Sequence, residues 1–306
     1  MNICVIGAGA IGGWVAARLV LAGEAVMALA SRGALDSVEI VQDGETKSAR
    51  LMRFDEPADI LIIAVKATSL SAAATSARML IGPDTIIVPM LNGVPWWFVD
   101  GLQLRSIDPD GGIAAALPVE RLIGCVVHAS CSRSGEAVIV KHADKLLIGE
   151  PNGENSERLA RLVALFERAR LRPEQTADVR RAIWYKLWGN ATLNPLSALT
   201  RAATDRLLAN PESRSWMLEG MAELAAIGAA IGCPVSESGE DRTRVTERLG
   251  AFKTSMLQDV EAGRPIELEA LLGAPREIAR ARAIETPALD RLYEVTKLMA
   301  ESLGLY

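Results

Sequence analysis

The chain has 306 residues, of which 50% are hydrophobic and 23% are charged, and its formal net charge is −5. This length suits two domains, and the composition can bury a sizeable core. The acidic balance gives no reason to expect nucleic acid or acidic membranes as partners. Only two histidines and four cysteines are present, with no C-x-x-C pair, so we expect no metal site.

No stretch of the sequence is long and apolar enough to predict a membrane helix. The longest uncharged runs, residues 3–17 and 85–99, have 15 residues each and contain glycine or proline, whereas a spanning helix needs ~20. The first residues also lack the basic segment that opens a secretion signal. We therefore expect a cytoplasmic protein.

The first half of the chain alternates short apolar runs with segments of helical spacing. Residues 2–6 are apolar and β-branched, as in a buried parallel strand. Similar strands are expected at 25–30, 59–65, 85–89, 122–130, 137–140 and 145–148, with a turn at Ala143-Asp144 before the last. Helices are expected at 11–22, 69–80 and 156–169. The alternation predicts an α/β domain over residues 1–176 with a doubly wound parallel sheet.

After Pro173 the pattern changes, and from about residue 180 to the end the sequence predicts helices and no strands. Most of the expected helices begin with a polar residue able to cap the N-terminus or with a proline in the first turn. These starts stand at Asn210-Pro211, at Ser238 with Asp241, at Glu267 and at Thr286-Pro287. We expect the helix that Ser238 caps to run to about residue 260. An all-α second domain is therefore predicted over residues 177–306.

A glycine-rich turn joins the first predicted strand to the first predicted helix. It has the spacing G-x-G-x-x-G and comprises Gly7, Ala8, Gly9, Ala10, Ile11 and Gly12. The first glycine allows a tight turn, the second lets the backbone approach a pyrophosphate, and the third allows close helix packing. The N–H groups and positive dipole end of the helix attract phosphates. We expect a dinucleotide site; the alternative is a glycine-rich turn without a ligand.

The residues after the second strand indicate which dinucleotide binds. NAD-binding domains carry an acidic residue there for the ribose 2′-hydroxyl, but this chain has Ser31-Arg32. A guanidinium can pair with a 2′-phosphate, so we infer NADP(H) rather than NAD; the alternative is an ordinary surface arginine. Lys66, at the end of its strand, is either a second cofactor contact or a solvated lysine.

The helix predicted at residues 182–190 carries a lysine among aromatic residues. Lys186 is the centre of residues 184–188 (WYKLW), and burying an unpaired ammonium is costly. Asn190 and Asn194 follow at four-residue intervals and so share its face. Because Pro195 disfavours helix for the residue before it, we expect Asn194 at a helix break. The stripe is either a polar site or a lysine that reaches water beside two capping asparagines.

Three other polar groups are candidates for a site. Ser255 and Asp259 lie four residues apart on a later helix, and Asp259 can equally be a surface acid. Glu267 falls in the first turn of the next helix, where the helix dipole alone favours a carboxylate. Asn92-Gly93 follows the strand at 85–89 and is a turn signal that also faces the predicted cofactor crevice.

The order and spacing of these pieces resemble those of the ketopantoate reductase (2-dehydropantoate 2-reductase) family over essentially the whole chain. The resemblance rests on Gly7-x-Gly9-x-x-Gly12, Lys66-Ala67, Asn92-Gly93, Trp184-x-Lys186-Leu187, Asn190, Asn194-Pro195-Leu196, Ser255-Met256-Leu257-Gln258-Asp259 and Glu267. It implies a Rossmann domain followed by a helical domain like the C-terminal domain of 6-phosphogluconate dehydrogenase.

The resemblance also implies an activity, the NADPH-dependent reduction of ketopantoate to (R)-pantoate in pantothenate and coenzyme A biosynthesis. It implies that Lys186 is the general acid and that Glu267 assists it. It further assigns Asn190, Asn194 and Ser255 to the substrate, and Lys66, Asn92 and Arg32 to the cofactor. The chemistry agrees, because a free lysine has a pKa of ~10.4 and is protonated at neutral pH, so it can protonate an alkoxide.

Two segments depart from the family pattern. Residues 95–99 (PWWFV) are unusually aromatic, and 268–273 (LEALLG) replace a stretch in which many members have an aspartate and then more polar residues. Both bear on the choice of substrate. A second hypothesis is therefore the reduction of another small 2-oxo or 3-oxo acid, and a third is a non-catalytic NADP-binding sensor. We expect a homodimer formed through the helical domain.

Overall fold

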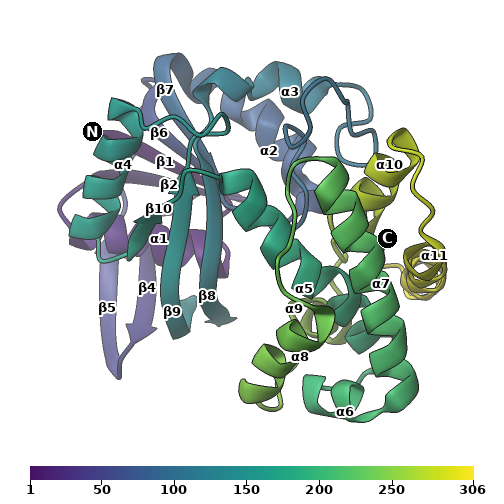
Figure 1. Ribbon diagram of the computed structural model, residues 1–306. Helices are drawn as coiled ribbons and strands as arrows, with labels where there is room; N and C mark the ends of the chain where they lie inside the picture. Colours follow the sequence, from purple (N-terminus) through teal and green to yellow (C-terminus); the bar gives the residue numbers. More distant parts are fainter. The chain divides into compact units, whose positions relative to one another are not determined.

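The computed structural model describes all 306 residues, which form two compact units (Figure 1). The α/β unit comprises Met1–Leu91 and Gly111–Ala182, and the helical unit comprises Asn92–Asp110 and Ile183–Tyr306. The predicted fold class, a parallel α/β domain followed by an all-α domain, is confirmed. The predicted boundary between residues 176 and 177 stays a prediction. The sequence pattern did not indicate that residues 92–110 belong with the helices.

The first sheet of the α/β unit is parallel except at one edge. Its order is β3-β2-β1-β6-β7, and only β3 runs antiparallel to its neighbour. The bounds are β1 Asn2–Ile6, β2 Ala25–Ala30, β3 Gly33–Ala34, β6 Ala58–Ile63 and β7 Ile81–Pro89. All four strands predicted in this region are present, because apolar, β-branched residues suit strands that are buried on both faces.

Helices complete the α/β unit. Trp14 of α1 and Phe166 of α4 pack into one core with Val5 and Ile62 of the sheet. The α-helices are α1 Ala10–Leu21, α2 Leu70–Ala77, α3 Gly112–Ala116 and α4 Glu157–Arg168, and the 3-10 turns are η1 Ala67–Ser69, η2 Arg78–Leu80 and η3 Val119–Arg121. The carboxyl end of β1 therefore leads directly into a helix anchored by its own core residues.

A second, mixed sheet was only partly predicted. Its order is β10-β9-β4-β5, and β8 pairs with β9. The bounds are β4 Ser37–Gln42, β5 Glu45–Arg50, β8 Gly124–Ser134, β9 Ala137–Gly149 and β10 Pro173–Gln175. The predicted turn at Ala143-Asp144 is wrong. The strand β9 continues through Ala143 and Asp144 without a break. Its pairing with β8 is instead irregular, with register shifts next to His128 and Ser130.

A partly buried ion pair connects α4 to the residue that follows β9. The carboxylate of Glu150, 3% exposed, accepts hydrogen bonds from Arg158 Nη2 at 2.6 Å and from Ser156 Oγ at 2.5 Å. Burial raises the pKa of Glu150, but these two donors outweigh it, so the pKa lies below its ordinary 4.5. The stabilisation is therefore complete above pH 4.5 and is lost as the pH falls through the lowered pKa.

Replacing Glu150 with glutamine is expected to destabilise the α/β unit by about 2 kcal/mol at pH 7, less than a fully buried pair because Arg158 stays partly hydrated. The variant should also lose less stability than the wild type on acidification below pH 4.5. Urea unfolding between pH 7 and pH 3 measures both effects. Glu45→Gln is the matched control, because Glu45 pairs with Lys47 on the surface. An equal loss in the two variants would contradict the prediction.

The helical unit contains no strand. Its elements are α5 Val179–Thr200, α6 Thr204–Ala209, α7 Pro211–Ala230, α8 Gly239–Arg248, α9 Ser255–Glu261, the π-helical turn Glu269–Gly273, α10 Ala274–Ala281 and α11 Pro287–Ser302. The predicted start signals are present: Asn210 and Ser238 cap α7 and α8 through their side chains. None of the helices has both the length and the apolar character that a membrane crossing requires.

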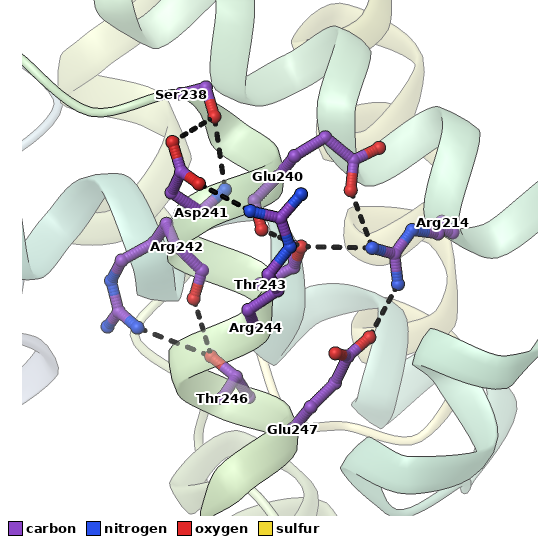
Figure 2. Close-up of polar contacts among 9 residues, drawn as sticks. All are labelled: Arg214, Ser238, Glu240, Asp241, Arg242, Thr243, Arg244, Thr246 and Glu247. Atoms are coloured by element: carbon purple, nitrogen blue, oxygen red, sulfur yellow. Dashed lines mark hydrogen bonds and ion pairs between the residues drawn. The ribbon is translucent and has the colours of Figure 1, made fainter.

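The helix that Ser238 caps is shorter than predicted. Figure 2 shows Ser238 Oγ accepting the Asp241 N–H, as a capping residue does. The helix ends at Arg248 rather than near residue 260, because Gly250 takes a left-handed φ of +71° and stops it. Arg214 of α7 holds α8 in place through ion pairs with Glu240 and Glu247, which lie about two turns apart (Figure 2).

The helix α5 is longer than predicted and rests on α7. The indole N–H groups of Trp184 and Trp188 donate to the carbonyl oxygens of Leu224 and Met221. The predicted break at Asn194 is wrong, because the helix runs through Pro195 to Thr200. Proline removes one backbone hydrogen bond, but every residue from 191 to 198 is buried, and that packing keeps the segment helical.

Candidate active site

The glycine-rich turn packs closely against the end of the neighbouring strand β6. Gly7 has a φ of +96°, and a Cβ on it would lie 2.6 Å from the carbonyl oxygen of Ala64, just after β6. A Cβ on Gly12 would lie 2.1 Å from the carbonyl oxygen of Gly7. The two glycines therefore serve the close packing of strand, turn and helix that their spacing predicts.

The start of α1 fits a pyrophosphate. No side chain caps its first turn, and no acidic residue lies in it. Gly9 is exposed, and a Cβ there would meet no atom within 4 Å, so the backbone is open to a ligand. The turn also lies at the carboxyl edge of β1, between β2 and β6, the position at which open α/β sheets bind ligands. These residues therefore suit a dinucleotide phosphate group.

Two predicted cofactor residues lie at the same edge of the sheet. The N–H groups of Gly7 and Ala8 donate to the carbonyl oxygen of Leu29 at 2.8 and 3.2 Å, which fixes the glycine turn on the end of β2. Arg32 is exposed in the turn that follows β2. Lys66 is half-buried after β6, directly before η1. The roles of Arg32 and Lys66 at a cofactor stay predictions.

The predicted polar stripe lies on one continuous helix. Lys186, Asn190 and Asn194 occupy successive turns of α5, within a sector of about 80°. Lys186 and Asn190 are half-buried, and Asn194 is 6% exposed. The Nζ of Lys186 donates a hydrogen bond to Oδ1 of Asn92 at 3.0 Å. The ammonium is therefore hydrogen-bonded to an amide of another segment. This contact favours a polar site over a lysine that only reaches water.

Asn92 stands on a loop that packs against the π-helical turn. The N–H of Val94 donates to the carbonyl oxygen of Ala270 at 2.8 Å. Gly93 has a φ of +79°, and a Cβ there would lie 2.4 Å from the same oxygen. Only glycine allows this approach. The role of Asn92 at the cofactor stays a prediction; what the structure shows is its contact with the candidate acid.

The remaining predicted site residues differ in exposure. Ser255 is exposed as the first residue of α9, whose N-cap is Thr254. Asp259 is not the surface acid that its sequence also allowed, because it is 3% exposed and pairs with Arg264 at 2.9 Å. Glu267 is 6% exposed and lies just before the helical turn that follows. The structure thus buries two carboxylates in the helical unit, those of Asp259 and Glu267.

Sequence reasoning missed Arg242 of α8. A Cβ on Gly189, between Lys186 and Asn190, would lie 2.6 Å from its Nη2. The guanidinium also stands over the ring of Tyr185 at 5.7 Å. A glycine inside a helix lowers its stability by ~1 kcal/mol and often marks a close approach. Gly189 was therefore the sign in the sequence that a side chain from another helix approaches α5 at this point.

Comparisons with known proteins agree with these features. The family model described as ketopantoate reductase PanE/ApbA matches residues 3–153, and the model of its C-terminal part matches residues 178–300. The 2-dehydropantoate 2-reductase of Mesorhizobium japonicum is 34% identical over 100% of both chains. A crystal structure from Ralstonia solanacearum MolK2 is 44% identical over 99% of both chains, with a TM-score of 0.94.

A more distant solved structure shows the same relationship. The 2-dehydropantoate 2-reductase of Methylococcus capsulatus is 27% identical over 99% of this chain and 98% of its own, with a TM-score of 0.84. Family models covering both units and full-length relatives together make the chain an oxidoreductase that acts with a nicotinamide cofactor. The chain belongs to the ketopantoate reductase family.

Proposed function

We propose that this protein reduces ketopantoate to (R)-pantoate with NADPH. The observation that carries the proposal is the half-buried Lys186, whose ammonium is held by Asn92 and followed on its helix by two amides. The full-length relative named 2-dehydropantoate 2-reductase supports the choice of substrate. The product would feed pantothenate and coenzyme A synthesis, as the resemblance in sequence implies.

The proposed chemistry needs one hydride and one proton. A reduced dinucleotide held at the glycine-rich turn would supply the hydride for the carbonyl carbon of the oxo acid. Lys186 stabilises the negative charge that develops on the carbonyl oxygen and then gives that oxygen its proton. Asn190, Asn194 and Ser255 hold the carboxylate and hydroxyl groups of the substrate, and they add no negative charge that would repel it. Glu267 assists Lys186 in the active site, as the resemblance in sequence implies.

Mixing the purified protein with NADPH and ketopantoate tests this function, because oxidation of NADPH lowers its absorbance. Turnover is the expected result, and no turnover on ketopantoate would reject the named substrate. A panel of other 2-oxo and 3-oxo acids then tests the second hypothesis, and a better substrate in that panel would replace ketopantoate. Family membership among oxidoreductases argues against the non-catalytic sensor.

NADP(H) rather than NAD(H) is proposed on account of Arg32. The change Arg32→Glu is expected to raise the KM for NADPH by about tenfold or more, because a carboxylate repels the 2′-phosphate that a guanidinium would pair with. The KM for NADH should change much less, since NADH lacks that phosphate. Steady-state assays with both cofactors measure the ratio. Arg78→Glu, on an exposed site at the end of α2, is the charge-matched control. Equal losses with both cofactors would contradict the assignment.

A further inference from the structure

The last residues of the chain turn back onto the segment that carries Glu267. After α11, Gly304 takes a left-handed φ of +67°, and the N–H of Leu305 donates to the carbonyl oxygen of Ala300 at 2.8 Å. This is the geometry of a glycine C-cap. Leu305 is 4% exposed, and its carbonyl oxygen accepts the N–H of Ile266 at 3.1 Å. The residue just before Glu267 is thereby tied to the end of α11.

Two tyrosine hydroxyls bind the residues that follow Glu267. Tyr306 and Tyr293 both donate to Oε1 of Glu269, at 2.5 and 2.6 Å. Gly273 leaves room for this carboxylate, since a Cβ there would lie 2.0 Å from Oε2. Burial, and then the hydrogen bond to the carboxylate, raise the pKa of both phenols. Both are therefore protonated donors at neutral pH.

The π-helical turn that begins at Glu269 continues the connection. Its next residue, Ala270, accepts the N–H of Val94 at 2.8 Å, and so fixes the loop that bears Asn92. Asn92 in turn accepts from Lys186. An unbroken series of short contacts within the helical unit therefore joins Tyr306 to the candidate acid. Single π-helical turns of this kind are frequent at functional sites.

We propose that Tyr306 is a positioning residue for the reduction. By holding Glu269 it sets the carbonyl oxygen of Ala270, and through that oxygen it sets the loop whose Asn92 orients the ammonium of Lys186. The kinetic part of this inference rests on the proposed function; the ordering of the loop does not. A tail that only stabilised the fold would leave the orientation of Lys186, and hence kcat, unaffected once the protein is folded.

The variant Tyr306→Phe tests the inference, because it keeps the ring and removes only the donor. We expect kcat with NADPH and ketopantoate to fall about tenfold, equivalent to ~1.4 kcal/mol. The KM for NADPH should change less than kcat, since the glycine turn, Arg32 and Lys66 belong to the α/β unit and only Asn92, among the predicted cofactor residues, lies on the loop. Hydrogen exchange at the Val94 amide, followed by mass spectrometry of peptides covering 92–94 and 266–273, should become about tenfold faster.

Tyr185→Phe is the matched control. It removes another tyrosine–carboxylate bond of the helical unit, Tyr185 to Glu237 at 2.8 Å, and should leave exchange at Val94 unchanged. Exchange in Tyr306→Phe like that of the wild type would overturn the inference, and so would an unchanged kcat beside an active wild type. If the wild type does not reduce ketopantoate, the proposed function fails, and the exchange comparison alone still decides the role of Tyr306.

Discussion

Replacing Lys186 with alanine is expected to lower kcat for ketopantoate by ~10²–10⁴-fold, the usual contribution of a positioned general acid. The substitution removes both the cation that stabilises the developing alkoxide and the proton that completes the product. Asn92, which accepts a hydrogen bond from Lys186 at 3.0 Å, would lose its charged donor. The loss of NADPH absorbance at saturating concentrations of both reactants measures the effect.

The control is Lys47→Ala, which removes an exposed lysine that pairs with Glu45 on β5. It should leave kcat unchanged. Undiminished turnover by the Lys186 variant would show that another group donates the proton. His128 lies on β8 and His142 on β9, outside the helix α5 and the loop of Asn92, so we expect neither to donate the proton. Replacing either should leave the shape of the pH profile unchanged.

The second large effect is expected at Gly12. In Gly12→Ala the new Cβ would lie 2.1 Å from the carbonyl oxygen of Gly7, a backbone atom that cannot move without shifting the turn. Overpacking of this kind destabilises by ~1–3 kcal/mol, so the melting temperature of the unliganded protein should fall by about 2–12 °C. NADPH affinity should fall as well, because the phosphate-binding turn is distorted. Thermal unfolding and fluorescence titration with NADPH measure the two losses.

Gly9→Ala separates the two effects. Its Cβ would meet no protein atom within 4 Å, so the melting temperature of the unliganded protein should not fall. The same methyl group would stand where the backbone must approach a pyrophosphate, so the Kd for NADPH should rise about tenfold or more. Tight NADPH binding by this variant would mean that the dinucleotide does not lie against Gly9.

The strands of the first sheet could be predicted because the composition of each short segment is enough to indicate a strand. Apolar, β-branched runs such as residues 2–6 are buried on both faces and have few other possible structures. The hairpin β4–β5 was missed because its second strand, residues 45–50 (ETKSAR), is exposed except at Ala49. Its stability comes from pairing with β4 rather than from its own composition. Asp43-Gly44, both with positive φ, is a hairpin turn signal that was present in the sequence.

The helical unit shows the same division between local and distant causes. Capping residues such as Asn210 and Ser238 bind N–H groups only two or three residues further along the chain. The helix starts that they mark could therefore be predicted from the sequence. The continuation of α5 past Pro195 depends on burial by residues far away in the sequence, which a local rule cannot weigh. The same holds for the site. The spacing of Lys186, Asn190 and Asn194 is local, whereas the contacts of Lys186 with Asn92 and of Gly189 with Arg242 join distant segments.

The assignment of residues 92–110 to the helical unit has a consequence for synthesis. Val94, Phe98 and Leu104 belong to the helical core, yet the ribosome makes them before residues 111–182 of the other unit. Synthesis proceeds at ~5–20 residues per second. These apolar side chains therefore remain unburied for several seconds before the rest of the helical core is made. This interval exposes the tryptophans at 96 and 97 together with Phe98. The nascent chain therefore carries an exposed apolar segment, prone to aggregation, until the helices are complete.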